Sequence, residues 1–175
     1  MKIIAFAGSN SSKSINKKLV TYASTLFKNV EVEILDLREY QAPLFSVDIE
    51  KQIGQAKEAL AFLAKLKSAD MLIMSLAENN GNYSTAFKNL FDWCSRIEKD
   101  VFQKKPTLLM ATSPGGRGGK SVLEIAQTNL PRFGVDIKAV FSLPSFNDNF
   151  DVENNKISNP ELDTELKEII NNFEL

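Results

Sequence analysis

A polar loop near the amino terminus has the composition of an anion-binding site. Residues 8–16 read GSNSSKSIN and stand directly before an amphipathic segment. Hydroxyl groups donate hydrogen bonds without adding charge, and the free N–H groups and dipole of a following helix favour an anion. The loop predicts a phosphate site made by Ser9, Ser11, Ser14, Ile15 and Asn16. A simpler interpretation of Ser14 is that it only caps the helix.

The glycine content of this loop limits the ligand. A dinucleotide-binding turn has the spacing G-x-G-x-x-G, because a pyrophosphate needs close approach of the backbone. Here Gly8 is the only glycine of the loop. A single phosphate, as in a mononucleotide, is therefore the favoured guest.

Two further loops carry groups suited to a flat heterocycle. AENNGNYS, residues 77–84, supplies amides, a carboxylate and a flexible glycine, Gly81. SPGGRGGKS, residues 113–121, nearly spells the P-loop motif G-x-x-x-x-G-K-[ST], but Pro114 replaces its first glycine and removes a backbone donor. We interpret this stretch as bare backbone against which a ring can lie without side-chain clash.

Composition excludes several classes of function. The 175 residues are 43% apolar and 25% charged, with a formal net charge of −1 and no histidine. We therefore expect no nucleic-acid partner and no membrane partner. A Ser-His-Asp triad and a histidine zinc site are impossible, and we predict no metal site and no catalytic side chain. The single cysteine, Cys94, and the lack of a long apolar run indicate a cytoplasmic protein.

Short apolar runs alternate along the chain with segments of helical periodicity. The pattern predicts strands over 3–7, 30–35, 71–76, 107–112 and 135–140, and helices over 19–27, 53–66, 87–97, 122–130 and 162–173. Such alternation is typical of a parallel sheet covered on both faces. We predict one domain over residues 1–175, a flavodoxin-like three-layer α/β/α sandwich with a five-stranded parallel sheet in the order 2-1-3-4-5.

This strand order brings the three unusual loops together. In an open parallel sheet, ligands bind beyond the carboxyl ends of the strands, where the strand order reverses. The loops after the first, third and fourth strands meet there. They are the serine-rich, amide-rich and glycine-rich loops, so the sequence predicts one composite site.

The three loops resemble the signatures of the NAD(P)H-dependent FMN reductase family. GSNSSKSIN resembles G-S-x-R-x-x-S-x-N, AENNGNYSTAFKNLFDW resembles P-E-Y-N-x-S-x-P-x-x-L-K-N-x-x-D-W, and SPGGRGG resembles the family's third, glycine-rich loop. The likeness runs through about residues 1 to 140, and the KN-x-x-DW segment is its most specific part. The family includes azo-, quinone- and chromate-reducing enzymes that hold FMN non-covalently, usually as dimers or tetramers.

The resemblance implies a function and a set of binding residues. Hydride would pass from NAD(P)H to FMN and then, by a ping-pong mechanism, to a small acceptor such as a flavin, quinone, azo compound or metal oxyanion. The chain would form a homodimer or homotetramer, with Asp92 and Trp93 in packing or subunit contacts. The implied cofactor-binding residues are Ser9, Ser11, Ser14, Ile15 and Asn16 at the phosphate, Ala77, Glu78, Asn79, Asn80 and Gly81 along the ring and ribityl chain, and Ser113, Pro114, Gly115 and Gly116 at the other ring edge.

The chain departs from the family pattern at three positions. Ser11 replaces the loop arginine that would pair with phosphate, and Lys13 can compensate from two positions away. Asn79 replaces an aromatic residue, which Tyr83 can restore. Thr85 replaces a proline at a helix start.

Two other functions fit the same fold. A flavodoxin-like electron carrier would bind FMN without reacting with NAD(P)H, although such carriers are usually strongly acidic. A flavin-free regulatory or interaction protein would explain the missing arginine and tyrosine.

Overall fold

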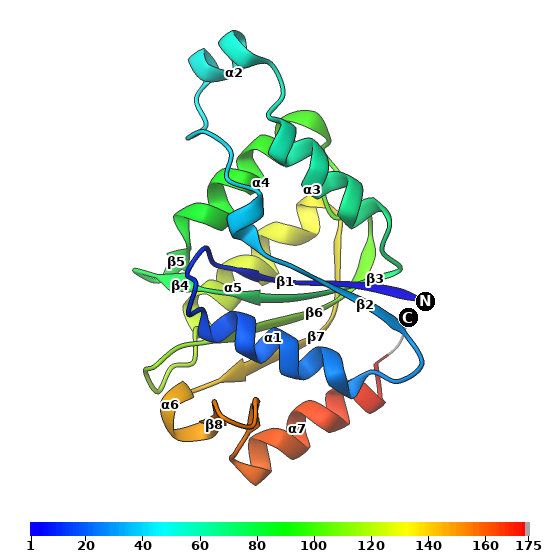
Figure 1. The fold of residues 1–175 in the computed structure, drawn as a ribbon, viewed down its shortest axis with the longest axis vertical. Helices are drawn as coiled ribbons and strands as arrows, with labels where there is room; N and C mark the ends of the chain where they lie inside the picture. Colours follow the sequence, from blue (N-terminus) through cyan, green and yellow to red (C-terminus); the bar gives the residue numbers. More distant parts are fainter. Residues whose placement is uncertain (174–175) are drawn as a thin grey trace.

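The computed structural model describes residues 1–173 and is built around a five-stranded parallel sheet (Figure 1). The sheet has the order β2-β1-β3-β6-β7. Its strands are β1 (Lys2–Gly8), β2 (Glu31–Leu35), β3 (Met71–Leu76), β6 (Lys105–Thr112) and β7 (Val135–Leu143). All four neighbouring pairs are parallel, which confirms the predicted flavodoxin-like order.

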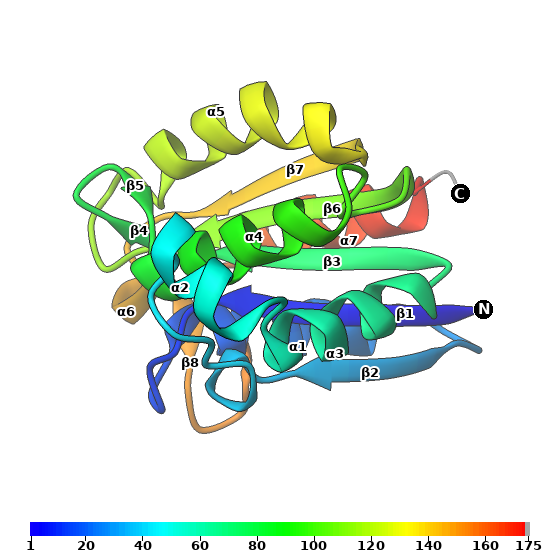
Figure 2. The same ribbon diagram turned by 90° about the horizontal axis from the view of Figure 1, so that it is seen from above.

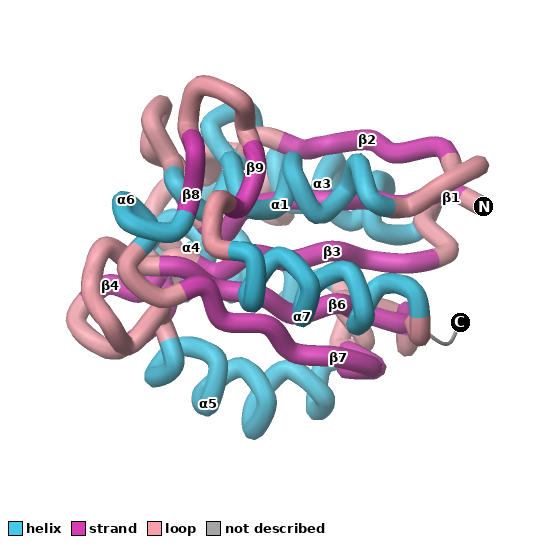
Figure 3. The backbone as a smooth tube through the Cα atoms, turned by 90° about the horizontal axis from the view of Figure 1, so that it is seen from below, coloured by secondary structure: helices cyan, strands magenta, loops and turns pink. Residues whose placement is uncertain are grey.

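Helices cover both faces of the sheet, as Figures 2 and 3 show from opposite sides. The helices α3 (Lys57–Lys67), α4 (Thr85–Ile97) and α5 (Lys120–Asn129) pack on one face, and α1 (Ile15–Leu26) and α7 (Pro160–Asn171) pack on the other. Successive strand side chains point to opposite faces. Ile4 and Phe6 therefore enter the first core, whereas Ile3 and Ala5 enter the second. The predicted three layers are confirmed.

The connection after β2 differs most from the sequence prediction. It contains a short 3-10 turn, η1 (Leu37–Glu39), and a separate helix, α2 (Val47–Ile53). Gly54, at φ +72°, ends α2, so the helix predicted over 53–66 is wrong in its first part. Leu60 lies within α3 but is 44% exposed and does not face the core. Residues 44–53, here called the α2 arm, project from the body of the molecule (Figure 1).

The remaining elements are small. A two-stranded hairpin joins β4 (Glu78–Asn79) to β5 (Asn82–Tyr83), and a second joins β8 (Phe150–Asp151) to β9 (Lys156–Ile157). A 3-10 turn, η2 (Leu130–Phe133), follows α5, and α6 (Phe146–Asn149) follows β7. Among residues 1–173 there is no helix with both the length and the apolar character needed to cross a membrane.

Candidate functional site

Three loops meet at the carboxyl ends of β1, β3 and β6 and enclose a pocket of about 220 Å³, here called the loop pocket. The loops concerned are those that the sequence singled out. Ten of the fourteen predicted site residues line the pocket, together with two that were not in that set. The lining residues are Ser9, Ser11, Lys13, Ser14, Ile15, Asn16, Ala77, Glu78, Asn79, Thr112, Ser113 and Pro114.

The serines of the first loop accept hydrogen bonds from the loop's own backbone. Ser9 Oγ accepts from the Ser11 N–H at 3.2 Å, and Ser11 Oγ accepts from the Lys13 N–H at 3.2 Å. Ser14 caps α1, its Oγ accepting from the Lys17 N–H at 3.1 Å. A hydroxyl that accepts in this way keeps its own hydrogen to donate. The capping role and a phosphate-binding role of Ser14 are therefore compatible.

Asn16 uses its side chain to join three elements. Its Nδ2 donates to the carbonyl oxygen of Thr112 at 3.1 Å, and its Oδ1 accepts from the Thr112 N–H at 3.0 Å and from Ser75 Oγ at 2.8 Å. The side chain is buried and ties α1 to β3 and β6. The group that Asn16 can offer to a ligand is its backbone N–H, because the first N–H groups of a helix have no partner within the helix.

The second loop is anchored through Glu78. Its Oε2 accepts from the Val122 N–H at 3.0 Å in the first turn of α5. The N-cap of that helix is Gly119, which has no side chain to serve there, and a carboxylate is favourable near a helix N-terminus. The anchor holds the β4–β5 hairpin and leaves Asn79 against the loop pocket.

Asn80 and Gly81 do not line the loop pocket. They form the tip of the β4–β5 hairpin, with φ +51° and φ +72° respectively. These left-handed conformations match the residue types, because glycine and asparagine adopt them at the lowest cost. The composition that attracted attention in the sequence is thus explained in part by the hairpin turn.

Tyr83 does not stand in for the missing aromatic residue at the loop pocket. Its ring is buried and packs edge-on against Phe87, with centroids 5.3 Å apart. Burial raises the pKa of its hydroxyl to about 12. Tyr83 therefore stabilises the junction between the β4–β5 hairpin and α4.

The four glycines of the third loop fall into two pairs. Gly118 and Gly119 have φ +59° and +78°, and a Cβ at Gly118 would lie 2.4 Å from Ser142 Oγ. By contrast, a Cβ at Gly116 would meet no atom within 4 Å, and one at Gly115 would meet only Ser113 Oγ at 3.9 Å. Neither Gly115 nor Gly116 lines the loop pocket, but both are exposed beside Ser113 and Pro114, which do. Their open backbone fits the close approach of a flat ring.

The KN-x-x-DW segment holds the connection that leads into the α2 arm. Asn89 accepts from the Phe45 N–H at 2.8 Å and donates to the carbonyl oxygens of Ala42 and Pro43, both at 3.1 Å. Trp93 Nε1 also donates to the Pro43 carbonyl oxygen at 2.7 Å. These bonds explain the segment by packing, in agreement with the sequence interpretation of Trp93.

This connection forms one wall of a second pocket, of about 300 Å³, which shares Asn79 with the loop pocket. Apart from Asn79, none of its residues belongs to the predicted site. Half of the others lie in the long connection after β2, which has no motif of its own apart from Pro43. The other half lie within the first two signature segments but were not assigned to the ligand. The lining residues are Asn10, Leu37, Tyr40, Gln41, Ala42, Leu44, Asn79, Ser84, Thr85, Ala86 and Asn89.

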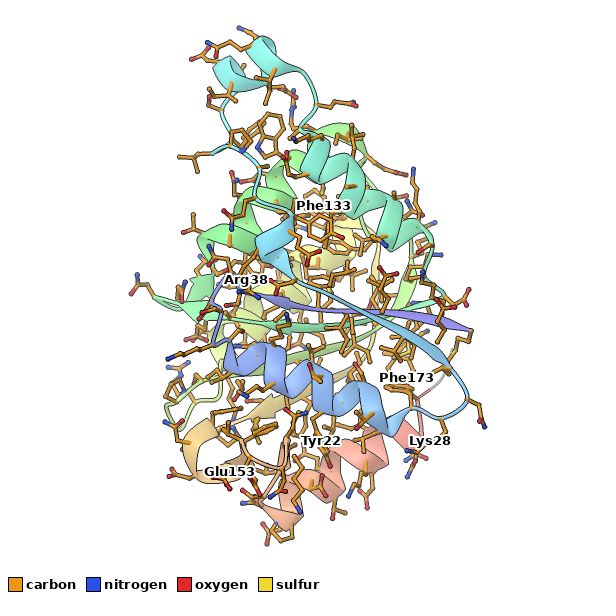
Figure 4. All side chains as sticks on the ribbon, viewed as in Figure 1. Tyr22, Lys28, Arg38, Phe133, Glu153 and Phe173 are labelled. Atoms are coloured by element: carbon orange, nitrogen blue, oxygen red, sulfur yellow. The ribbon has the colours of Figure 1, made fainter. Side chains whose placement is uncertain are left out.

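The charges near the first loop are concentrated on Asp36. Its carboxylate accepts from Arg38 at 2.6 Å and from Lys17 at 2.5 Å. The Arg38 guanidinium, with help from Lys17, holds the pKa of Asp36 well below its usual range. Figure 4 shows Arg38 at the end of β2 that faces the loops. Away from the site, Cys94 is a packed core residue, and its burial raises the pKa of the thiol to about 12.

Comparison with known proteins agrees with this geometry. Residues 1–148 match the family model of NADPH-dependent FMN reductases. The chain is 32% identical over 121 residues to an FMN-dependent NADPH-azoreductase of Staphylococcus aureus, which is 66% of this chain and 62% of that protein. It is 27% identical over 119 residues to an NAD(P)H-dependent FMN reductase of Pseudomonas aeruginosa, covering 67% of this chain and 63% of that enzyme.

The fold also matches a solved structure over nearly its whole length. The flavoenzyme FerB, an NAD(P)H:(acceptor) oxidoreductase of Paracoccus denitrificans, superposes with a TM-score of 0.77 at 19% identity. The match covers 98% of this chain and 94% of FerB. At that level of identity the likeness concerns the fold.

Proposed function

This chain belongs to the NADPH-dependent FMN reductase family, and we propose that it passes hydride from NAD(P)H to non-covalently bound FMN and then to a small acceptor by a ping-pong mechanism. Membership of the family makes it an oxidoreductase that uses FMN with NAD(P)H. The names of its relatives point to a quinone or an azo compound as the acceptor. A free flavin and a metal oxyanion are the other acceptors that we propose. The single observation that carries the proposal is the loop pocket at the carboxyl ends of the strands. In it the hydroxyl-rich first loop and the start of α1 lie opposite Ser113 and Pro114, with the open backbone of Gly115 and Gly116 beside them.

We assign the phosphate end of FMN to the first loop. Ser9, Ser11 and Ser14 offer hydroxyl hydrogens. Ile15 and Asn16, which also line the pocket, offer the first backbone N–H groups of α1, because these have no partner within the helix. A helix N-terminus favours the negative charge of the phosphate. These groups bind and orient the cofactor.

The ring and ribityl chain are assigned to the second and third loops. Glu78 keeps the β4–β5 hairpin on α5, and the hairpin in turn presents Asn79. The proposed contacts along this wall are Ala77, Glu78, Asn79, Asn80 and Gly81, and those along the opposite wall are Ser113, Pro114, Gly115 and Gly116. FMN supplies the redox chemistry when bound, so the proposal names no catalytic side chain.

The proposal has a direct test. Purified protein should be yellow, or become so when FMN is added, and should bleach anaerobically with NADH or NADPH. Absence of flavin binding at micromolar FMN would contradict it. Bound FMN that neither nicotinamide reduces would instead support the electron-carrier alternative.

We further propose a single cytoplasmic domain over residues 1–175 that assembles as a homodimer or homotetramer. The support for self-association is the α2 arm, a helix with no buried residue. Leu44, Val47 and Ile53 are 74%, 54% and 50% exposed there. Light scattering of the double variant Leu44→Ser, Val47→Ser should show a smaller assembly than the unaltered chain. An unchanged mass would place the contact elsewhere.

A further inference from the structure

The loop pocket contains few charges. Of its lining residues, only Lys13 and Glu78 carry ionisable side chains. One carboxylate oxygen of Glu78 accepts from the Val122 N–H at the N-terminus of α5, where the helix dipole offsets part of the carboxylate charge. A phosphate dianion would share this pocket with a carboxylate, and a cation nearby would offset their repulsion.

Three other basic side chains near the loops are engaged elsewhere, and Lys18 does not line the pocket. Lys17 and Arg38 both bind the Asp36 carboxylate, at 2.5 Å and 2.6 Å. Arg117, on the third loop, donates to Ser121 at 3.0 Å and does not line the pocket. Lys13 lines the pocket, is exposed, and makes no ion pair within residues 1–173.

Ser11 occupies the position of the family's arginine but carries no charge, and it makes hydrogen bonds within the turn instead. Its hydroxyl oxygen accepts from the Lys13 N–H at 3.2 Å. The Ser14 N–H donates to the Ser11 carbonyl oxygen at 3.2 Å. Ser11 therefore fixes the backbone of the turn that carries Lys13, while Lys13 holds the charge.

We propose that Lys13 is the phosphate-binding cation of this site and that it sets the preference for a phosphorylated over an unphosphorylated flavin. The inference rests on the proposed function, because it assumes that the loop pocket receives the FMN phosphate. Lysine offers a compact point charge, unlike the planar fork of arginine. Because Lys13 is exposed, solvent and salt screen its attraction for the phosphate.

The test is a fluorescence titration of the apoprotein with FMN and, separately, with riboflavin. Lys13→Gln should weaken FMN binding about tenfold, a typical loss for one charge-assisted hydrogen bond, and leave riboflavin binding unchanged. The FMN affinity of Lys13→Gln should also depend less on salt, because one phosphate-neutralising cation is gone. Lys18→Gln is the matched control, since it removes the same charge from α1 at a residue outside the pocket.

A rescue variant separates charge from structure. Adding Ser11→Arg to Lys13→Gln should recover most of the lost FMN affinity, because it restores a cation in the same turn. Lys13→Gln should melt at the same temperature as the unaltered protein, since Lys13 is exposed. The double variant should melt slightly lower, because Ser11→Arg also removes the hydroxyl that accepts from the Lys13 N–H.

Unchanged FMN affinity in Lys13→Gln overturns the inference, as does an equal loss for FMN and riboflavin or an equal loss in Lys18→Gln. If the unaltered protein binds neither flavin, the proposed function itself fails and the inference fails with it. A loss confined to FMN and to Lys13→Gln supports both.

Discussion

The loops after β1 and β6 face the same pocket but keep their shapes by opposite means. Side chains hold the shape of the first loop, because the serine hydroxyls accept hydrogen bonds from the backbone and Asn16 bridges to Thr112 and Ser75. Backbone conformation holds the shape of the third loop, because Gly118 and Gly119 adopt left-handed conformations and lie against β6 and β7. The first loop lines the pocket with several hydroxyl groups, whereas the third loop lines it with Ser113 and Pro114 and has exposed glycine backbone beside them.

This difference matches the two halves of the proposed ligand. A phosphate requires several preorganised donors, which short hydroxyl side chains and helix N–H groups provide. A flat ring requires close approach, which glycine allows. The contrast also predicts which substitutions harm stability and which harm binding.

The largest effect should come from Gly118→Ala. A Cβ there would lie 2.4 Å from Ser142 Oγ and 2.8 Å from the Pro144 nitrogen, at φ +59°. Clash and backbone strain together should lower the free energy of unfolding by about 3 kcal/mol or more, as measured in urea. Gly81→Ala is the control for strain alone, since φ is +72° and the nearest atom to its Cβ would be Ser121 Cβ at 3.9 Å, and it should cost about 1 kcal/mol. Equal losses would mean that the third loop is not held by close packing.

The next effect tests the side-chain bridge of the first loop. Asn16→Ala removes three hydrogen bonds and leaves the buried N–H and carbonyl of Thr112 without their partner. We expect the free energy of unfolding to fall by about 2–3 kcal/mol. Ser14→Ala, which removes only a helix cap, should cost about 1 kcal/mol. If the two variants are equally stable in urea, the Asn16 bridge is not what holds the loop.

The sheet was predictable because its signal is local. A strand buried on both faces is a continuous apolar run, and the run over residues 71–76 coincides with β3. The helix predicted over 53–66 was wrong in its first part, because apolar spacing continues across Gly54, where the chain turns before α3 begins at Lys57. The β4–β5 hairpin was missed because strands of two residues have no periodicity.

The site was predictable at the level of loops and not at the level of each side chain. Serine, amide and glycine enrichment marked three segments, and parallel topology brought them together. The task of Asn16 depended on Thr112 and Ser75, which are 96 and 59 residues away in the sequence. Likewise, the carboxylate of Glu78 is used by Val122, 44 residues further on. Such partners are set by the folded arrangement, and composition carries no trace of them.

Asp36, which follows β2 and lies beside the first loop, should make the stability of this side of the protein depend on pH in acid. Because Arg38 and Lys17 hold the pKa of Asp36 below its usual range, the unfolded chain takes up this proton at a higher pH than the folded protein. The stabilisation is present above the unfolded pKa of about 3.9 and is lost as pH falls through it toward the folded pKa. The stability gap between the unaltered protein and Asp36→Asn should therefore narrow between pH 5 and pH 2.

The matched control for Asp36→Asn lies on the third loop. Arg117→Gln removes an exposed charge that donates a hydrogen bond to the Ser121 hydroxyl. Its effect on urea stability should be small and should not vary between pH 5 and pH 2. A gap for Asp36→Asn that stays constant over this range would show that the Asp36 ion pairs do not contribute to the stability of the first-loop side.

The smallest effect on stability should come from Gly116→Ala, which completes the comparison. No atom lies within 4 Å of the Cβ position and φ is not in the left-handed region, so the unfolding free energy should change by less than about 0.5 kcal/mol. A bulkier variant, Gly116→Leu, should be similarly stable but should weaken FMN binding, because its side chain would fill the space assigned to the ring. Titration of both variants with FMN and urea measures the two effects separately. Normal FMN affinity in Gly116→Leu would show that the ring does not lie against this part of the third loop.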